Sequence, residues 1–67
     1  MSEFNNLTPE QKTAVGTAIR AAKERQERVS VTTTSGDEVY ASPNAGKYAW
    51  GVNSGETGCN IARGISP

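Results

Sequence analysis

Three basic side chains near the N-terminus have the spacing of a phosphate-contacting helix flank. Lys12, Arg20 and Lys23 fall along one side of an expected helix, with Gly16 between them. A glycine there would let a phosphate backbone approach closely, and the three cations would surround it. Gly16 is also compatible with close packing between two helices or with simple tolerance, which we favour, because the net charge of zero is unlike that of a typical nucleic-acid module.

The remaining chemistry-bearing side chains do not indicate catalysis. The chain has no histidine, the side chain used most often as a general acid or base. Cys59 would need a base to become a nucleophile, and Arg63, four residues on, is not one. We interpret Cys59 as a small core residue or an inert thiol. We therefore expect no catalytic residues and no enzyme activity.

Metal and cofactor sites are not indicated either. Histidine, the commonest zinc ligand, is absent, and a single cysteine cannot form an intrachain disulfide. The regularly spaced carboxylates of a calcium loop are also missing. We expect neither a metal nor a cofactor.

Two aromatic side chains, Tyr48 and Trp50, are two residues apart and share one face of an expected strand. Such a pair either packs in the core or forms a binding surface, since tyrosine and tryptophan are enriched at interface hot spots. We favour core packing, because Lys47 is the only basic neighbour in the sequence.

A helix is predicted over residues 8–28, after a short polar lead at residues 1–7. Thr8-Pro9-Glu10-Gln11 combines an N-cap, a proline suited to the first helical position and a glutamine where a capping-box partner stands. Apolar side chains then recur at helical spacing and form a narrow stripe of small residues. The stripe consists of Val15, Ala18, Ile19 and Ala22, with Val29 close to it.

Strands are predicted over residues 29–34, 38–42 and 47–53, because these segments alternate and are separated by Gly-, Pro- and Asn-containing turns. Residues 59–65 fit either a fourth strand or one helical turn, and we favour the strand. One strand face collects Val29, Val31, Val39, Ala41, Tyr48, Trp50 and Val52, and we expect the helix to cover it. The other face collects Ser30, Thr32, Thr34, Tyr40, Ser42, Lys47, Ala49, Gly51 and Asn53.

The expected architecture is a single α+β domain over residues 1–67. One N-terminal amphipathic helix packs on a three- to four-stranded antiparallel β-meander. This element order resembles that of double-stranded-RNA-binding domains. The stretch that matches their basic cluster, residues 58–63, lacks such a cluster, so we do not assign the chain to that family.

Length and composition favour a cytoplasmic chain that associates with itself. A domain of this size buries little surface alone and usually needs a staple or an oligomer. The N-terminus has no signal-peptide pattern, the chain has no apolar run of membrane-spanning length, and one unpaired cysteine fits a reducing compartment.

Function is expected to be binding rather than catalysis. We favour a small non-catalytic protein-binding module of the adaptor or inhibitor type, of a kind that phages and mobile elements encode. Its expected binding surface contains Thr32, Tyr40 and Lys47. One alternative is a nucleic-acid-binding module that uses Lys12, Arg20 and Lys23. Another is a structural or assembly subunit, for example of a viral particle, that self-associates through Tyr48, Trp50 or an edge strand.

Overall fold

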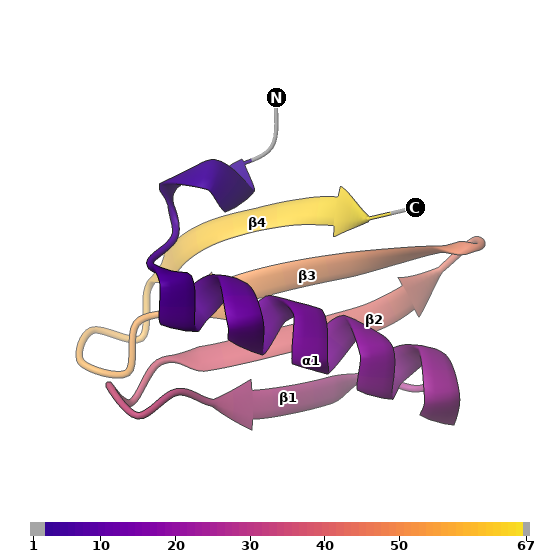
Figure 1. The fold of residues 1–67 in the computed structure, drawn as a ribbon, viewed down its shortest axis with the longest axis horizontal. Coiled ribbons are helices and arrows are strands. Elements are labelled where there is room, and N and C mark those ends of the chain that lie inside the picture. The colour runs from indigo at the N-terminus through magenta and orange to yellow at the C-terminus, as the bar shows by residue number, and fades with distance from the viewer. Residues whose placement is uncertain (1–2, 67) are drawn as a thin grey trace.

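The computed structural model describes residues 3–66, which form one helix layered on a four-stranded antiparallel sheet (Figure 1). The strand order is β1-β2-β3-β4, so each strand pairs with its sequence neighbour. The predicted α+β meander is confirmed, and the ambiguous segment at residues 59–65 is the fourth strand. The elements are η1 (Glu3–Asn6), α1 (Pro9–Arg25), β1 (Val29–Thr32), β2 (Glu38–Asn44), β3 (Lys47–Asn53) and β4 (Asn60–Ser66).

Helix α1 begins at the predicted capping box. The Gln11 backbone N–H donates to Thr8 Oγ1 at 3.2 Å, and the Thr8 N–H donates to Gln11 Oε1 at 3.0 Å. The helix ends at Arg25, so the predicted end at residue 28 is wrong. Gln26 adopts the left-handed conformation, with φ of 55°, and its N–H caps the Ala22 carbonyl at 2.7 Å. This early reversal is needed because β1 starts at Val29 and must run back beneath the helix.

The N-terminal segment is part of the core, which the prediction of a polar lead at residues 1–7 missed. Within its described part, η1 places the Phe4 ring edge-on to the Trp50 indole, with ring centroids 5.8 Å apart and planes at 82°. Leu7 is buried, and the Lys12 ammonium lies over the Phe4 ring, 5.8 Å from its centroid. Residues 1 and 2 lie outside the described part of the chain.

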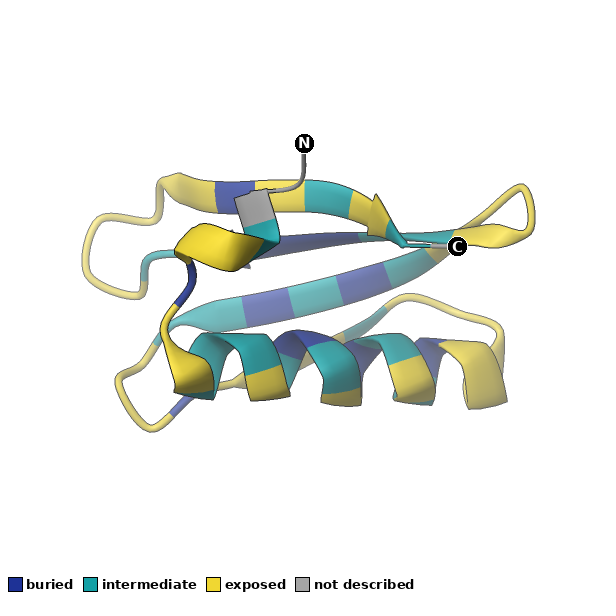
Figure 2. Cartoon of the chain, turned by 45° about the horizontal axis from the view of Figure 1, so that its top comes forward, coloured by how far each residue is buried: buried dark blue, intermediate teal, exposed yellow. Residues whose placement is uncertain are grey.

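The predicted covered face of the sheet is confirmed. Val39 pairs with Val31 and Val52, and Trp50 pairs with Ala41 and Gly64, which aligns their side chains beneath α1. The helix contributes mainly small buried residues to this interface, namely Val15, Ala18 and Ala22. Buried positions concentrate between the two layers, whereas β4 carries more exposed positions than β2 or β3 (Figure 2). The buried core is Leu7, Val15, Ala18, Ala22, Val39, Ala41, Trp50, Val52 and Ala62.

Strand β1 ends at Thr32, two residues before its predicted end at Thr34. Thr33 is buried, and Thr34 turns away from the strand so that its N–H donates to Glu10 Oε2 at 2.8 Å. The Thr34 and Ser35 hydroxyls also donate to the Glu10 carboxylate. The placement of Thr34 on the uncovered sheet face is therefore wrong, because Glu10 draws it into a polar contact with the start of α1.

Asp37 joins three parts of the chain at this end of the sheet. Its carboxylate accepts from Gln11 Nε2 at 3.0 Å and from the Gly55 N–H at 3.3 Å, while its own N–H donates to Thr33 Oγ1 at 3.1 Å. The start of α1, the β1–β2 turn and the β3–β4 loop are thus linked through one side chain. The turn itself relies on Gly36, whose φ of 91° favours glycine.

The β2–β3 hairpin has a two-residue turn that is tighter than predicted. Strand β2 extends to Asn44, which pairs with Lys47, so Ala45 and Gly46 alone reverse the chain. Both have positive φ, 53° for Ala45 and 81° for Gly46. Paired positive φ values are typical of a type I′ turn, in which asparagine or glycine suits the first position better than alanine.

Replacing Ala45 by asparagine should stabilise the fold. Asn tolerates the left-handed conformation that Ala45 adopts with strain. We expect Ala45→Asn to raise the free energy of unfolding by about 0.5–1 kcal/mol in urea titrations. The matched variant Ala45→Val should lower it, because a β-branched side chain is disfavoured at positive φ. An Asn variant less stable than wild type would contradict the turn geometry.

Glu10 should make stability depend on pH. The pKa of Glu10 lies below its usual 4.5, mainly because the Thr34 hydroxyl donates a hydrogen bond to the carboxylate and, to a smaller extent, because the Thr34 backbone N–H also donates to it. The folded state therefore binds this proton more weakly than the unfolded state. The ionised Glu10 carboxylate therefore contributes fully to stability above about pH 4.5, and this contribution is lost as the pH falls through the pKa of Glu10 in the folded state.

The measurement is the difference in unfolding free energy between wild type and Glu10→Gln across that range. We expect the difference to be largest at neutral pH and to shrink in acid. A difference that stays constant with pH would contradict the role assigned to the Glu10 carboxylate.

Candidate functional site

The candidate site lies on the sheet face turned away from α1, which no described helix covers. We call this surface the open face. Its rows follow the strand register, with Ser30, Tyr40, Gly51 and Arg63 in one row across all four strands. The residues of the open face are Arg28, Ser30, Thr32, Glu38, Tyr40, Ser42, Lys47, Ala49, Gly51, Asn53, Ile61, Arg63 and Ile65.

Tyr40 is fixed at the centre of the open face. A Cβ at Gly51 would clash with the hydroxyl end of Tyr40, so the absence of a side chain there makes room for this side chain to lie on the β3 backbone. The Arg28 guanidinium lies over the same ring, 4.9 Å from its centroid. This cation–π contact and the Gly51 backbone hold the ring in place. Tyr40 is accordingly half-buried.

Two large aliphatic side chains stand beside this row at the edge of the sheet. Ile61 is 49% exposed and Ile65 is 56% exposed, and within residues 3–66 these are the large hydrophobic residues classed as exposed. Ile65 pairs with Ala49 on the open face. Ile61 has no register partner on β3 because the register shifts between Val52 and Asn53, and we place it on the open face because the next residue, Ala62, is buried opposite Val52. Such exposure has a free-energy cost of about 25 cal/mol per Å² of apolar surface that stays in water.

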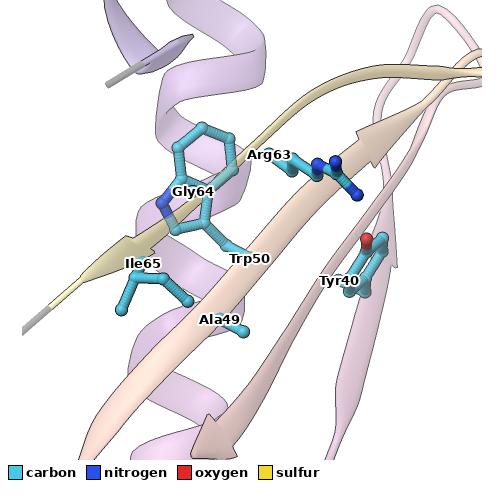
Figure 3. A pocket seen from close by; sticks show the side chains of 6 residues that line it. All are labelled: Tyr40, Ala49, Trp50, Arg63, Gly64 and Ile65. Carbon is cyan, nitrogen blue, oxygen red and sulfur yellow. The ribbon is translucent and has the colours of Figure 1, made fainter. Parts of the chain in front are cut away.

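A shallow hollow of about 380 Å³ is lined by Tyr40, Arg63 and Ile65 together with Ala49, Trp50 and Gly64 (Figure 3). Tyr40 and Arg63 flank Gly51 across β3, and Ile65 lies at the edge. The Trp50 indole lies on the helix side of the sheet, next to Gly64. The lining therefore combines an aromatic ring, a guanidinium and an aliphatic side chain in one concave area.

The three residues expected at the protein-binding surface lie on the open face but do not form one cluster. Thr32 pairs with Glu38, two residues along β2 from Tyr40, whereas Lys47 pairs with Asn44, four residues the other way. Their pairing partners, Glu38 and Asn44, are six residues apart along β2, so Thr32 and Lys47 are separated by about 20 Å along the strand direction. Of the three, Tyr40 is the one next to the hollow.

The three residues expected to contact phosphate all lie on α1, but their surroundings differ. Lys12 reaches the Phe4 ring, Arg20 is exposed, and Lys23 borders an open hollow together with Lys47. Lys12 and Lys23 are about 16 Å apart along the helix axis. No described atom lies within 4 Å of a Cβ built on Gly16, so this glycine is not required by packing inside the chain.

The other chemistry-bearing residues are placed as follows. Trp50 is buried, which confirms its core role, and Tyr48 packs against the core. Cys59 is exposed in the loop before β4, so the first of its two expected roles, a small core residue, is wrong, whereas the inert thiol stays a prediction. Among residues 3–66, no three His, Cys, Asp or Glu side chains are grouped to hold a metal ion.

No helix in the described part is both long and apolar enough to cross a membrane. No protein-family model matches the sequence, and searches of the curated proteins and of the solved structures also find no match.

The residues that sequence analysis missed are those that complete the open face. Arg28 was assigned to the helix, and Ile61, Arg63 and Ile65 lay in the ambiguous segment. The alternation of Ile61, Arg63 and Ile65 is the signal that could have placed them on one strand face. It could not show that this face would be the uncovered one.

Exchanging Gly51 for alanine should disturb Tyr40 specifically. The added methyl group would meet the ring, so Gly51→Ala should lower the free energy of unfolding by about 1–3 kcal/mol. In a Tyr40→Ala background the same change should be close to neutral, which a double-mutant cycle in urea measures. Gly16→Ala is the matched control and should stabilise by about 0.5–1 kcal/mol, because nothing obstructs its methyl group. Equal losses from Gly51→Ala in both backgrounds would contradict the Tyr40 placement.

Proposed function

We propose that this chain is a small non-catalytic protein-binding module whose contact surface is the β4 side of the open face. The observation that carries the proposal is the exposure of Ile65 in one hollow with Tyr40 and Arg63, together with the exposure of Ile61 earlier on the same strand. Exposed aliphatic groups grouped around a hollow are typical of interaction sites, whereas single scattered ones are not. A partner that covered them would remove apolar surface from water.

The types of side chain support a protein partner. Tyrosine and arginine are enriched among the residues that contribute most to binding at protein interfaces, particularly near the centre of the contact. Tyr40 is held by Arg28 and Gly51 before any partner arrives, so little conformational entropy would be lost on binding. We infer an adaptor or inhibitor of a cytoplasmic protein, of a kind that phages and mobile elements encode.

The geometry gives less support to a nucleic-acid partner. Single-stranded nucleic acid needs aromatic faces on which bases can stack. The one aromatic residue of the open face, Tyr40, lies on Gly51 and beneath Arg28. The assembly-subunit alternative loses two of its expected contact residues, because Tyr48 and Trp50 pack within the chain itself.

Protein capture with matched variants tests the proposal. Immobilised wild type and the variant Ile61→Ser/Ile65→Ser would be incubated with the same cytoplasmic extract, and bound proteins compared by quantitative mass spectrometry. The control Thr13→Ser/Thr17→Ser alters exposed positions on α1. We expect at least one protein to bind wild type and control and to be reduced about tenfold or more on the β4 variant, because about 1.4 kcal/mol of apolar burial would be lost.

Two other results would argue against this proposal. Binding that is unaffected by Ile61→Ser/Ile65→Ser would contradict the proposed surface. Salt-sensitive binding of labelled duplex or single-stranded oligonucleotides, lost on changing Lys12, Arg20 and Lys23 to glutamine, would favour the nucleic-acid alternative instead.

A further inference from the structure

We propose that the outer edge of β4 accepts an extended segment of the partner protein as a fifth strand, with apolar side chains toward α1 and acidic side chains at the open face. This inference rests on the proposed protein-binding function and specifies its mode. In such strand addition, main-chain hydrogen bonds supply affinity and alternate side chains supply specificity.

Strand β4 has an edge suited to pairing. It is the last strand of the sheet and is seven residues long. Its sequence contains none of the prolines, lysines or acidic side chains with which natural proteins protect edge strands, although Arg63 is present. The opposite edge differs, because β1 has only four residues and the N–H of Thr34 beyond it is bound to Glu10.

An apolar groove runs beside β4 on the helix side. Helix α1 packs mainly on β1, β2 and β3, while η1 packs on β4. Between them lies an open groove of about 360 Å³, which we call the β4 groove. Gly16 widens it, since a Cβ there would meet no described atom within 4 Å. The β4 groove is lined by Phe4, Val15, Gly16, Ile19, Trp50, Ile65 and Ser66.

The two sides of β4 offer different environments to an added strand. Successive side chains of a strand point to opposite faces, so every second residue would enter the β4 groove against Phe4 and Trp50. The intervening residues would lie on the open face beside Arg63. Ile65 borders both the β4 groove and the hollow next to Tyr40.

Charge complementarity favours an acidic segment. The charged side chains described on the open face are Arg28, Lys47 and Arg63 against one carboxylate, Glu38, which accepts from Asn53 Nδ2 at 3.3 Å. Glu10 and Asp37 are instead engaged at the β1–β2 turn. A chain of zero net charge therefore has an excess of positive charge on the open face, and Arg63 supplies it on β4 itself, where it would attract the carboxylates of an added strand.

A second copy of this chain fits the edge less well. Antiparallel pairing of two β4 strands centred on Arg63 would place the two Arg63 side chains directly opposite each other. Like charges at opposed positions destabilise a strand pair. A foreign segment with a carboxylate at that position would replace this repulsion with an attractive pair.

Displayed peptide libraries provide the probe. One library contains segments as long as β4 with alternating Ile, Leu, Val or Phe and Asp or Glu. A second library replaces the acidic positions by Lys or Arg, and a third keeps the acidic composition at helical spacing. We expect wild type to enrich the alternating acidic library over both others.

Enriched peptides would then be synthesised and titrated by fluorescence anisotropy. Gly16→Leu should weaken binding about tenfold or more by filling the β4 groove, and Arg63→Glu should do so by reversing the charge. Thr17→Leu is the matched control, since Thr17 lies on the other flank of α1 in the groove beside β1. Denaturant titrations confirm that each variant folds, and slower amide exchange within 60–66 on peptide binding would report strand pairing directly.

Three results would overturn the inference: no preference for the alternating acidic library, sensitivity to Thr17→Leu but not to Gly16→Leu, or peptide binding that leaves exchange within 60–66 unchanged. The proposed function would survive any of them if captured proteins still depended on Ile61 and Ile65. If that dependence were also absent, both proposals would fail.

Discussion

The packing of Trp50 against Gly64 is the constraint on which the rest of the structure depends. A Cβ at Gly64 would lie 2.7 Å from Cζ2 and 2.9 Å from Cε2 of the indole, so only glycine lets β4 approach the core at this level. Phe4 also contacts the indole, with the two ring planes nearly perpendicular. One aromatic side chain thereby connects β3, β4 and the N-terminal segment. In a chain this short with one cysteine, such contacts replace a disulfide.

The same constraint explains why β4 is the accessible edge. Because the indole and Phe4 cover the inner face of β4, α1 can lie over the other three strands and does not extend across the sheet. The space left between α1 and β4 is the β4 groove, and Gly16 keeps it open. The hydrogen bonds of Glu10 fix the opposite side of the molecule at the β1–β2 turn, and those of Asp37 connect that turn to the start of α1 and to the β3–β4 loop. The proposed binding site is thus the region that the chain's own side chains leave uncovered.

Local signals in the sequence predicted most of the fold. The capping box at Thr8 and the alternation from Val29 to Val52 depend on neighbouring residues, and both were placed correctly. The helix end at Arg25 was missed because Gln26 adopts a left-handed conformation that few sequence signals mark. The role of Phe4 was missed because its partner, Trp50, is distant in the sequence.

The candidate site was predictable only in part, for a related reason. Alternation placed Tyr40 on the uncovered face, but the contacts that hold it involve Arg28 and Gly51 on neighbouring strands. Thr32 and Lys47 share that face and are separated by strand register, which alternation alone does not define. The exposure of Ile61 and Ile65 follows from the position of β4 at the sheet edge, a property of topology rather than of composition.

Backbone amide exchange of the free chain, measured residue by residue by NMR over a dilution series, tests the central claim of an open β4 edge most directly. The account predicts that alternate amides within 60–66, those turned away from β3, exchange as fast as loop amides at every concentration. Amides of the same strand that face β3 should be protected. Uniform protection along β4 would contradict the account, because it would show that the edge is already paired, with a second copy or with another part of the chain.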